Sequence, residues 1–213
     1  MKKKILTVSL VVALIAIMVS GTLAYFTAED EVTNTFTIGS VIIEVVEDFQ
    51  KPQTMIPVVT VDESDPNYIN KDARVKNTGD NAAYVQMYVA IPKALDDVGA
   101  FIVVDANTGD WTDRTLAGTV EFDRVTYNVY MYRYKALLDV NAETSDVITA
   151  AYLAPQLDYD HDTNRFVMDG AVIADYVPGE SIDIYVAAQA IQAAGFADYD
   201  ASLNNFTTHP WAK

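Results

Sequence analysis

The chain has 213 residues and no cysteine, and its 30 aspartates and glutamates against 14 lysines and arginines give a formal net charge of −16. Without cysteine there is neither a disulfide framework nor a thiol nucleophile. A surface this acidic repels nucleic acid and anionic lipid, so we expect no nucleic-acid partner.

The first 24 residues have the pattern of a secretory signal peptide. Lysines at positions 2–4 precede an apolar run over 5–19, and small residues mark a cut between Ala24 and Tyr25. The run is also about the length of a membrane-spanning helix, which leaves a retained anchor as the alternative. Acidic residues follow the run instead of basic ones. We therefore expect a protein secreted to the extracellular matrix or cell surface, which contacts the membrane only before cleavage.

Residues 25–35 are predicted to be a short polar leader, and a strand-like run over 36–46 follows it. Phe36, Ile38, Val41 and Ile43 stand there among polar residues, as in a half-buried donor strand. Cleavage would free residues 25–46 as an unpaired β segment. Such a segment can complete the sheet of a neighbouring subunit, with these four side chains in its pockets. Head-to-tail donation does not close on itself, so it predicts filaments.

Strand-type sequence and turns then alternate along the chain. Residues 48–57 are predicted as a loop, and residues 58–61 as a brief strand. Residues 77–81 (NTGDN) are a turn between two strand-type runs and predict a hairpin. The run over 82–91 alternates strictly, which predicts a strand near the centre of a sheet. One face carries Val85, Met87, Val89 and Ile91, and the other carries Tyr84, Gln86, Tyr88 and Ala90.

The remaining elements complete an all-β pattern. A helical turn is predicted over 92–98, and strands over 101–104, 121–134, 147–153, 165–168, 171–174 and 181–196. The last of these has helix propensity in its second half, but the alternation at its start favours a strand. Short strands separated by turns predict a two-sheet antiparallel β-sandwich of the jelly-roll type, with short helical turns in its loops. We expect the sandwich to span 36–200, before a loosely ordered tail over 201–213.

Three blocks of the sequence resemble the TasA/camelysin family of exported biofilm-matrix fibre proteins. They are GTLAYFT at 21–27 with NTFTIGS at 34–40, VKNTGDNAAYVQMYVAIP at 75–92, and VPGESIDIYVAAQAIQAAGF at 177–196. The resemblance covers about half of the chain and implies that a dedicated signal peptidase removes the signal peptide. It also implies a structural subunit of a biofilm fibre, whose partners are copies of itself head-to-tail and accessory matrix proteins.

Camelysin-type proteins are described as metallopeptidases, so a secreted metallopeptidase is one alternative function. The chain has two histidines, His161 and His209, and lacks an H-E-x-x-H pair that would place two imidazoles on one helical face. We therefore expect no enzyme and no catalytic residue. A surface-associated binding or accessory module is the other alternative, because a sandwich supports many functions.

One acidic segment has the oxygen spacing of a calcium loop. Asp158, Asp160, Asp162 and Asn164 occupy positions 1, 3, 5 and 7 of a twelve-residue frame that closes on Asp169. The sixth position, where the loop needs glycine, is a threonine, and the flanks read as strands. Calcium is thus a hypothesis, and a polar hairpin loop is the alternative that we favour.

Tyrosines recur on two of the predicted strands, at positions 84, 88, 130, 132 and 134. They predict either a sugar-binding aromatic face or cross-strand pairs that stabilise a sheet. The second interpretation is the commoner one for such residues.

Overall fold

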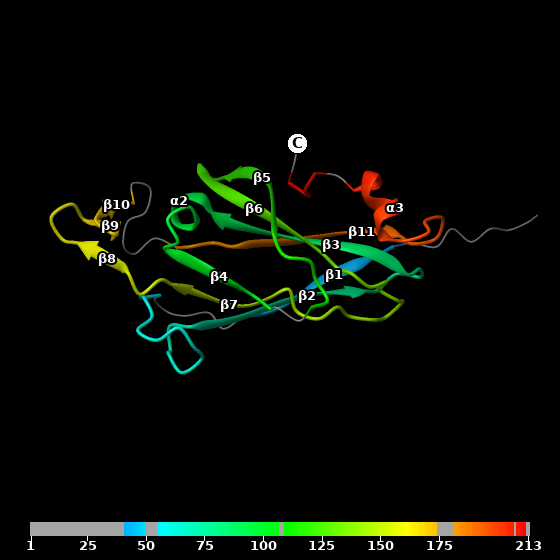
Figure 1. The fold of residues 1–213 in the computed structure, drawn as a ribbon, viewed down its shortest axis with the longest axis horizontal. Helices are drawn as coiled ribbons and strands as arrows, with labels where there is room; N and C mark the ends of the chain where they lie inside the picture. The colour runs from blue at the N-terminus through cyan, green and yellow to red at the C-terminus, as the bar shows by residue number, and fades with distance from the viewer. Residues whose placement is uncertain (1–40, 50–54, 107–108, 174–180, 207, 212–213) are drawn as a thin grey trace, which may run out of the picture. The chain divides into compact units, whose positions relative to one another are not determined.

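Two four-stranded antiparallel sheets form the body of the fold in the computed structural model (Figure 1). The structure describes residues 41–49, 55–106, 109–173, 181–206 and 208–211. The predicted cleavage site and leader therefore lie outside the described residues. The sandwich of antiparallel sheets confirms the predicted fold class.

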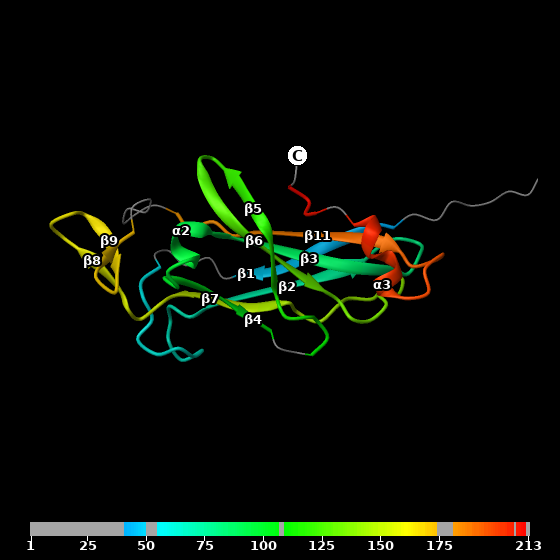
Figure 2. The same ribbon diagram turned by 45° about the horizontal axis from the view of Figure 1, so that its top comes forward.

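Both sheets combine strands that are far apart in the sequence. The first sheet has the order β1 (Ile43–Phe49), β2 (Ile69–Asn77), β7 (Ile148–Leu153) and β4 (Phe101–Asp105). The second has the order β11 (Tyr185–Gln192), β3 (Ala83–Pro92), β6 (Val125–Arg133) and β5 (Thr115–Phe122). A smaller sheet consists of β10 (Ala171–Val172), β9 (Arg165–Met168) and β8 (Leu157–Asp160). Strands β1 and β11 lie side by side at one edge of the two layers (Figure 2).

The main core lies between the two sheets. Val75 and Ile148 of the first sheet and Met87 and Val89 of the second are all fully buried in one cluster. Burying an aliphatic side chain of this size contributes about 1.5–3 kcal/mol relative to leaving it exposed. The core therefore stabilises a chain that has no cysteine and hence no disulfide framework.

Strand β3 is the centre of the second sheet, as its sequence predicts. It lies between β11 and β6 and pairs with both (Figure 1). Its face with Val85 and Ile91 belongs to the main core. Its opposite face places Tyr88 and Ala90 in a second buried cluster with Tyr127 and Val129. Because both faces of β3 are buried, almost every position of this strand carries an apolar residue.

The predicted hairpin over 77–81 is wrong, because the chain crosses between sheets there. Strand β2 belongs to the first sheet and β3 to the second. The buried side chain of Asn77 holds the crossing: its Nδ2 donates to the carbonyls of Asn81 (2.8 Å) and Leu138 (3.2 Å). Its Oδ1 accepts from the Gly79 amide (3.0 Å). Both strands bury an apolar face in the same core, so the turn connects two layers instead of two neighbours.

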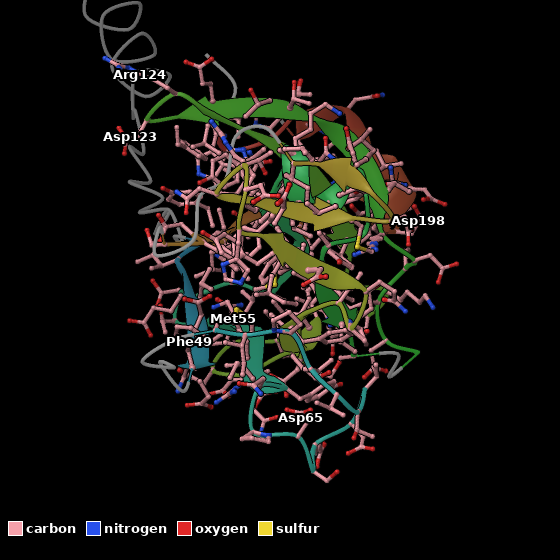
Figure 3. The ribbon with its side chains drawn as sticks, turned by 90° about the vertical axis from the view of Figure 1, so that its left-hand side faces the viewer. Phe49, Met55, Asp65, Asp123, Arg124 and Asp198 are labelled. Atoms are coloured by element: carbon pink, nitrogen blue, oxygen red, sulfur yellow. The ribbon has the colours of Figure 1, made fainter. Side chains whose placement is uncertain are left out.

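The predicted strand over 58–61 and loop over 48–57 also need correction. Strand β1 continues to Phe49. Residues 58–61 form no strand, because the amides of Val59 and Thr60 donate to the carboxylate of Asp65, at 2.6 and 3.1 Å, instead of to a neighbouring strand. Figure 3 shows Asp65 on this loop, well separated from Phe49.

Short helices follow the strands at two places. The predicted helical turn is α2 (Lys93–Asp96), and residues of the predicted tail form part of α3 (Tyr199–Ser202) and a 3-10 turn over Leu203–Asn205. Ser202 and His209 are buried, so the described part of the tail is packed and not loose. No helix among the described residues is long and apolar enough to cross a bilayer.

Candidate assembly interface

Strand β1 is an edge strand that is fully paired with β2. The register runs from Ile43 opposite Asn77 to Phe49 opposite Lys71. The amide of Thr78 donates to the carbonyl of Ile42 (2.9 Å), which extends the pairing one residue upstream. Ile43 also packs against the main core. The segment from Ile42 onward is therefore part of its own subunit's sheet.

This pairing corrects the predicted extent of the free donor segment. Of the four predicted donor residues, Phe36 and Ile38 lie outside the described residues, as do Ala24 and Tyr25 of the cleavage site. Val41 is half-buried and precedes β1, whereas Ile43 begins β1. The prediction that cleavage leaves residues 25–46 unpaired is therefore wrong at its end, because residues 43–46 pair with β2. Among the described residues, the pairing with β2 begins at Ile42.

An ion pair between a nearly buried lysine and a more exposed glutamate joins the far end of β1 to β2. The Lys71 ammonium lies 2.7 Å from the Glu47 carboxylate, and the side chain of Lys71 is only 7% exposed. The ring of Phe49 lies 4.9 Å from the same nitrogen. A lysine in this position needs its partner, because a buried cation without one is costly. The pair therefore fixes the register of β1.

On the opposite face of β2, one arginine joins three carboxylates. Arg74 contacts Asp48 (3.1 Å), Glu143 (3.1 Å) and Asp146 (3.4 Å). The hydrogen bonds that Arg74 donates to the carboxylates of Asp48 and Glu143 raise the pKa of Arg74. Burial is the main cause that raises the pKa of the nearby Asp72, and repulsion from Asp146 is the second. These contacts tie β1 to the 143–146 segment and hold several carboxylates close together.

The tyrosines do not form one aromatic face. The register of β3 with β6 sets Tyr88 opposite Met131, so Tyr130, Tyr132 and Tyr134 lie on the other side of the sheet. Tyr88 and Tyr132 are also fully buried. The prediction of a single sugar-binding aromatic face is therefore wrong. The second interpretation holds instead, because these tyrosines pack in the sheet and its two cores.

On the side of the sandwich that carries β4 and α2, tyrosine hydroxyls bind aspartates. The Tyr132 hydroxyl donates to Asp105 (2.7 Å) and that of Tyr130 to Asp96 (2.7 Å). Burial, with Asp96 as the second cause, raises the pKa of Tyr130 to about 12. Both hydroxyls thus act as hydrogen-bond donors and stay protonated at neutral pH.

A groove of about 500 Å³ opens where β3 and β6 meet the segment that begins α3. Its lining includes Tyr84, Arg133, Tyr134, Lys135, Tyr199 and Asp200. The edge of the Tyr84 ring meets the Tyr199 ring, with centroids 5.7 Å apart. The sequence analysis missed this groove. The available signal was a pair of cations two residues apart, at the end of a strand and just beyond it, in an acidic chain.

The residues of the calcium hypothesis lie in a β-hairpin. Asp160 pairs with Arg165 across β8 and β9, and its carboxylate accepts hydrogen bonds from the backbone and hydroxyl of Thr163. Asp162 and Asn164 lie in the same turn, and the Asn164 amide oxygen accepts a hydrogen bond from Tyr159.

The other two residues of that frame lie at the opposite end of the hairpin. Asp158 pairs with Val167, and Asp169 begins the next turn, between β9 and β10. Within the described ranges, no three acidic or histidine side chains are arranged to hold a metal ion. The structure thus brings Asp160, Asp162 and Asn164 into one turn but separates them from the other two. Calcium binding stays a hypothesis.

No family model matches the chain, and no curated protein matches it. The resemblance to the TasA/camelysin family thus depends on the three sequence blocks alone.

Proposed function

We propose that the protein is a secreted structural subunit of an extracellular fibre, assembled when the N-terminal segment of one copy adds to the sheet of the next. The resemblance to biofilm-matrix proteins supports this role, and so does the signal-peptide pattern, which predicts export and the release of a new N-terminus at Tyr25.

The position of β1 is the observation that carries the proposal. The strand lies at the edge of its sheet and begins at Ile43, so the predicted donor segment leads directly into an edge strand without a linker. Edge strands offer unpaired backbone groups to another chain. The two four-stranded sheets end in four such strands, β1, β4, β5 and β11.

The charge of the chain fits a subunit that stays monomeric until conditions favour assembly. A net charge of −16 keeps copies apart through mutual repulsion, which salt or cations screen. We therefore expect assembly to be faster at higher ionic strength. Calcium is one cation to include, because several carboxylates lie together around Arg74.

Electron microscopy of the purified chain 25–213 tests the proposal. Incubated at neutral pH with and without calcium, it should form filaments whose repeat matches one sandwich domain. Monodisperse particles under all conditions would instead favour an accessory or binding module.

A deletion then tests the role of the leader. Removing residues 25–35 should leave a monomer that folds, as circular dichroism would show, but does not elongate. Filaments of normal length from the 25–35 deletion would contradict strand addition by this segment.

A further inference from the structure

The groove lined by Tyr84 and Tyr199 contains two cations without a described carboxylate partner, which is unusual for this acidic chain. Most of the described cations are bound to the chain's own carboxylates, as are Lys71, Arg74, Lys76, Lys93 and Arg114. Arg133 and Lys135 both line the groove, and neither has an ion pair among the described residues. Two such cations thus lie in one place on a strongly acidic protein, although the Lys135 ammonium donates a hydrogen bond to the Gly109 carbonyl (2.8 Å).

The walls of the groove are held in place by aromatic contacts. The Tyr199 hydroxyl accepts a hydrogen bond from Gln86 Nε2 (2.6 Å), and its ring stacks on Phe206 with centroids 5.9 Å apart. The guanidinium of Arg133 lies 6.0 Å from the centre of the Tyr199 ring. A preformed wall of this kind binds an aromatic side chain at little cost in conformational entropy.

Two carboxylates lie on the α3 side of the groove. Asp198 caps α3, since its Oδ1 accepts from the Ala201 amide (2.9 Å), and Asp200 is exposed. The groove therefore has cations on the β6 side and acids on the α3 side. A ligand that matches it carries aromatic, anionic and cationic groups in a short length.

The predicted leader has this composition. Its sequence from Tyr25 is YFTAEDEVT, with two aromatic residues first and three acids at 29–31. Cleavage after Ala24 would also create a positively charged α-amino group at Tyr25. In an extended chain, this amino group and the acids would lie about 13–20 Å apart. The leader thus carries one cationic and one acidic group, opposite in sign to the acids and cations of the groove.

We infer that this groove receives the leader of a neighbouring copy, with Tyr25 and Phe26 against Tyr84 and Tyr199 and the acids 29–31 near Arg133 and Lys135. The inference rests on the proposed function and adds the place where the leader docks. Residues 25–41 extend to about 55 Å, which is long enough to connect one sandwich to the next. Because docking uses the new amino group, uncleaved precursor binds more weakly.

Charge reversal in the groove tests the inference. In the 25–213 chain, Arg133→Glu should slow filament growth about tenfold, and Lys135→Glu should slow it as well, because each places a carboxylate against the acidic leader. Arg124→Glu is the matched control. Arg124 is exposed at the tip of the β5–β6 hairpin, far from Asp198 (Figure 3), so the same change of charge should leave the growth rate within about twofold.

Reversing the charge of the leader should restore growth. Glu29→Lys with Glu31→Lys should slow wild-type assembly and partly rescue the Arg133→Glu variant, and circular dichroism melts would show that all the variants fold. Asp200→Asn should slow growth about threefold if it binds the amino group.

The outcomes separate the two proposals. An absence of filaments from wild-type chains would contradict the fibre function itself. Normal wild-type filaments with equal growth of Arg133→Glu and Arg124→Glu would overturn only the groove. Faster growth of Arg133→Glu would also overturn it, since that result means that the groove binds the leader of its own chain and must release it for assembly.

Discussion

The Lys71 ammonium lies 2.7 Å from the Glu47 carboxylate, on a side chain of which only 7% is exposed. Glu47→Ala leaves this cation nearly buried without a counter-ion. We expect a loss of about 1–3 kcal/mol in the free energy of unfolding, measured by urea denaturation. Glu44→Ala is the control, because Glu44 is an exposed residue of the same strand. Equal midpoints for the two variants would mean that the ion pair does not hold β1.

The crossing between the sheets depends on the buried amide of Asn77. Asn77→Ala removes its hydrogen bonds to the carbonyls of Asn81 and Leu138 and to the Gly79 amide. We expect the free energy of unfolding to fall by about 2 kcal/mol, because the Gly79 amide and the Asn81 carbonyl lose this partner, whereas the Leu138 carbonyl keeps its bond from the Ala83 amide. Asn67→Ala, on the 58–67 loop, should cost clearly less, and a thermal melt that ranks them the other way would contradict this role.

Tyr132 is expected to contribute through its hydroxyl. Tyr132→Phe keeps the ring in the core but removes the hydrogen bond to Asp105, which should cost about 1 kcal/mol. Tyr134→Phe is the matched control on the same strand, since Tyr134 packs against Trp111 through its ring. If chemical denaturation gives the same stability for both variants, the Asp105 contact adds nothing.

Tyrosine ionisation should limit stability at alkaline pH. The pKa of Tyr130 is raised to about 12, whereas an unfolded tyrosine titrates near about 10. A raised pKa in the folded state means that the stabilisation is complete below pH of about 10 and is lost as the pH rises toward 12. Alkaline unfolding followed by circular dichroism should therefore begin above pH of about 10, and Tyr130→Phe should make the decline shallower. An unchanged slope would contradict the assignment.

Asp65 should make the 58–67 loop sensitive to acid. The backbone amides of Asn67, Thr60 and Val59 lower the pKa of Asp65, so its stabilisation is complete above the unfolded value of about 3.9 and is lost as the pH falls through the lower folded value. In hydrogen exchange at neutral pH, Asp65→Ala should make the amides of Val59 and Thr60 exchange at least about tenfold faster. Asp62→Ala, in the same loop, should leave these two amides protected.

The sequence predicted most strands because burial follows their alternation. The two faces of β3 are the clearest case, since each face enters a different cluster. The predicted strand at 58–61 failed for a local reason: a single carboxylate, that of Asp65, binds amides that a neighbouring strand would otherwise use. Strand propensity does not record such competition between side chain and backbone.

The candidate assembly interface was harder to predict than the fold. The predicted end of the donor segment depends on where β1 pairs with β2, and the pairing partner of a strand is a long-range property. The groove likewise combines Tyr84, Arg133 and Tyr199 from three separate segments. Within the sequence, the close spacing of Arg133, the last residue of β6, and Lys135 was the signal for it.

The antiparallel pairing of β1 and β2 has a mechanical consequence for a fibre built in the proposed way. In such a fibre, a pulling force would enter the subunit through the chain that precedes Ile42. Directed along β1, this force would load the β1–β2 pair in shear. Its hydrogen bonds lie across the strand direction, so the register from Ile43 to Phe49 would resist the pull together. The ion pair between Glu47 and Lys71, near the other end of the strand, would be strained at the same moment. Such a subunit would yield abruptly under load instead of unzipping one residue at a time.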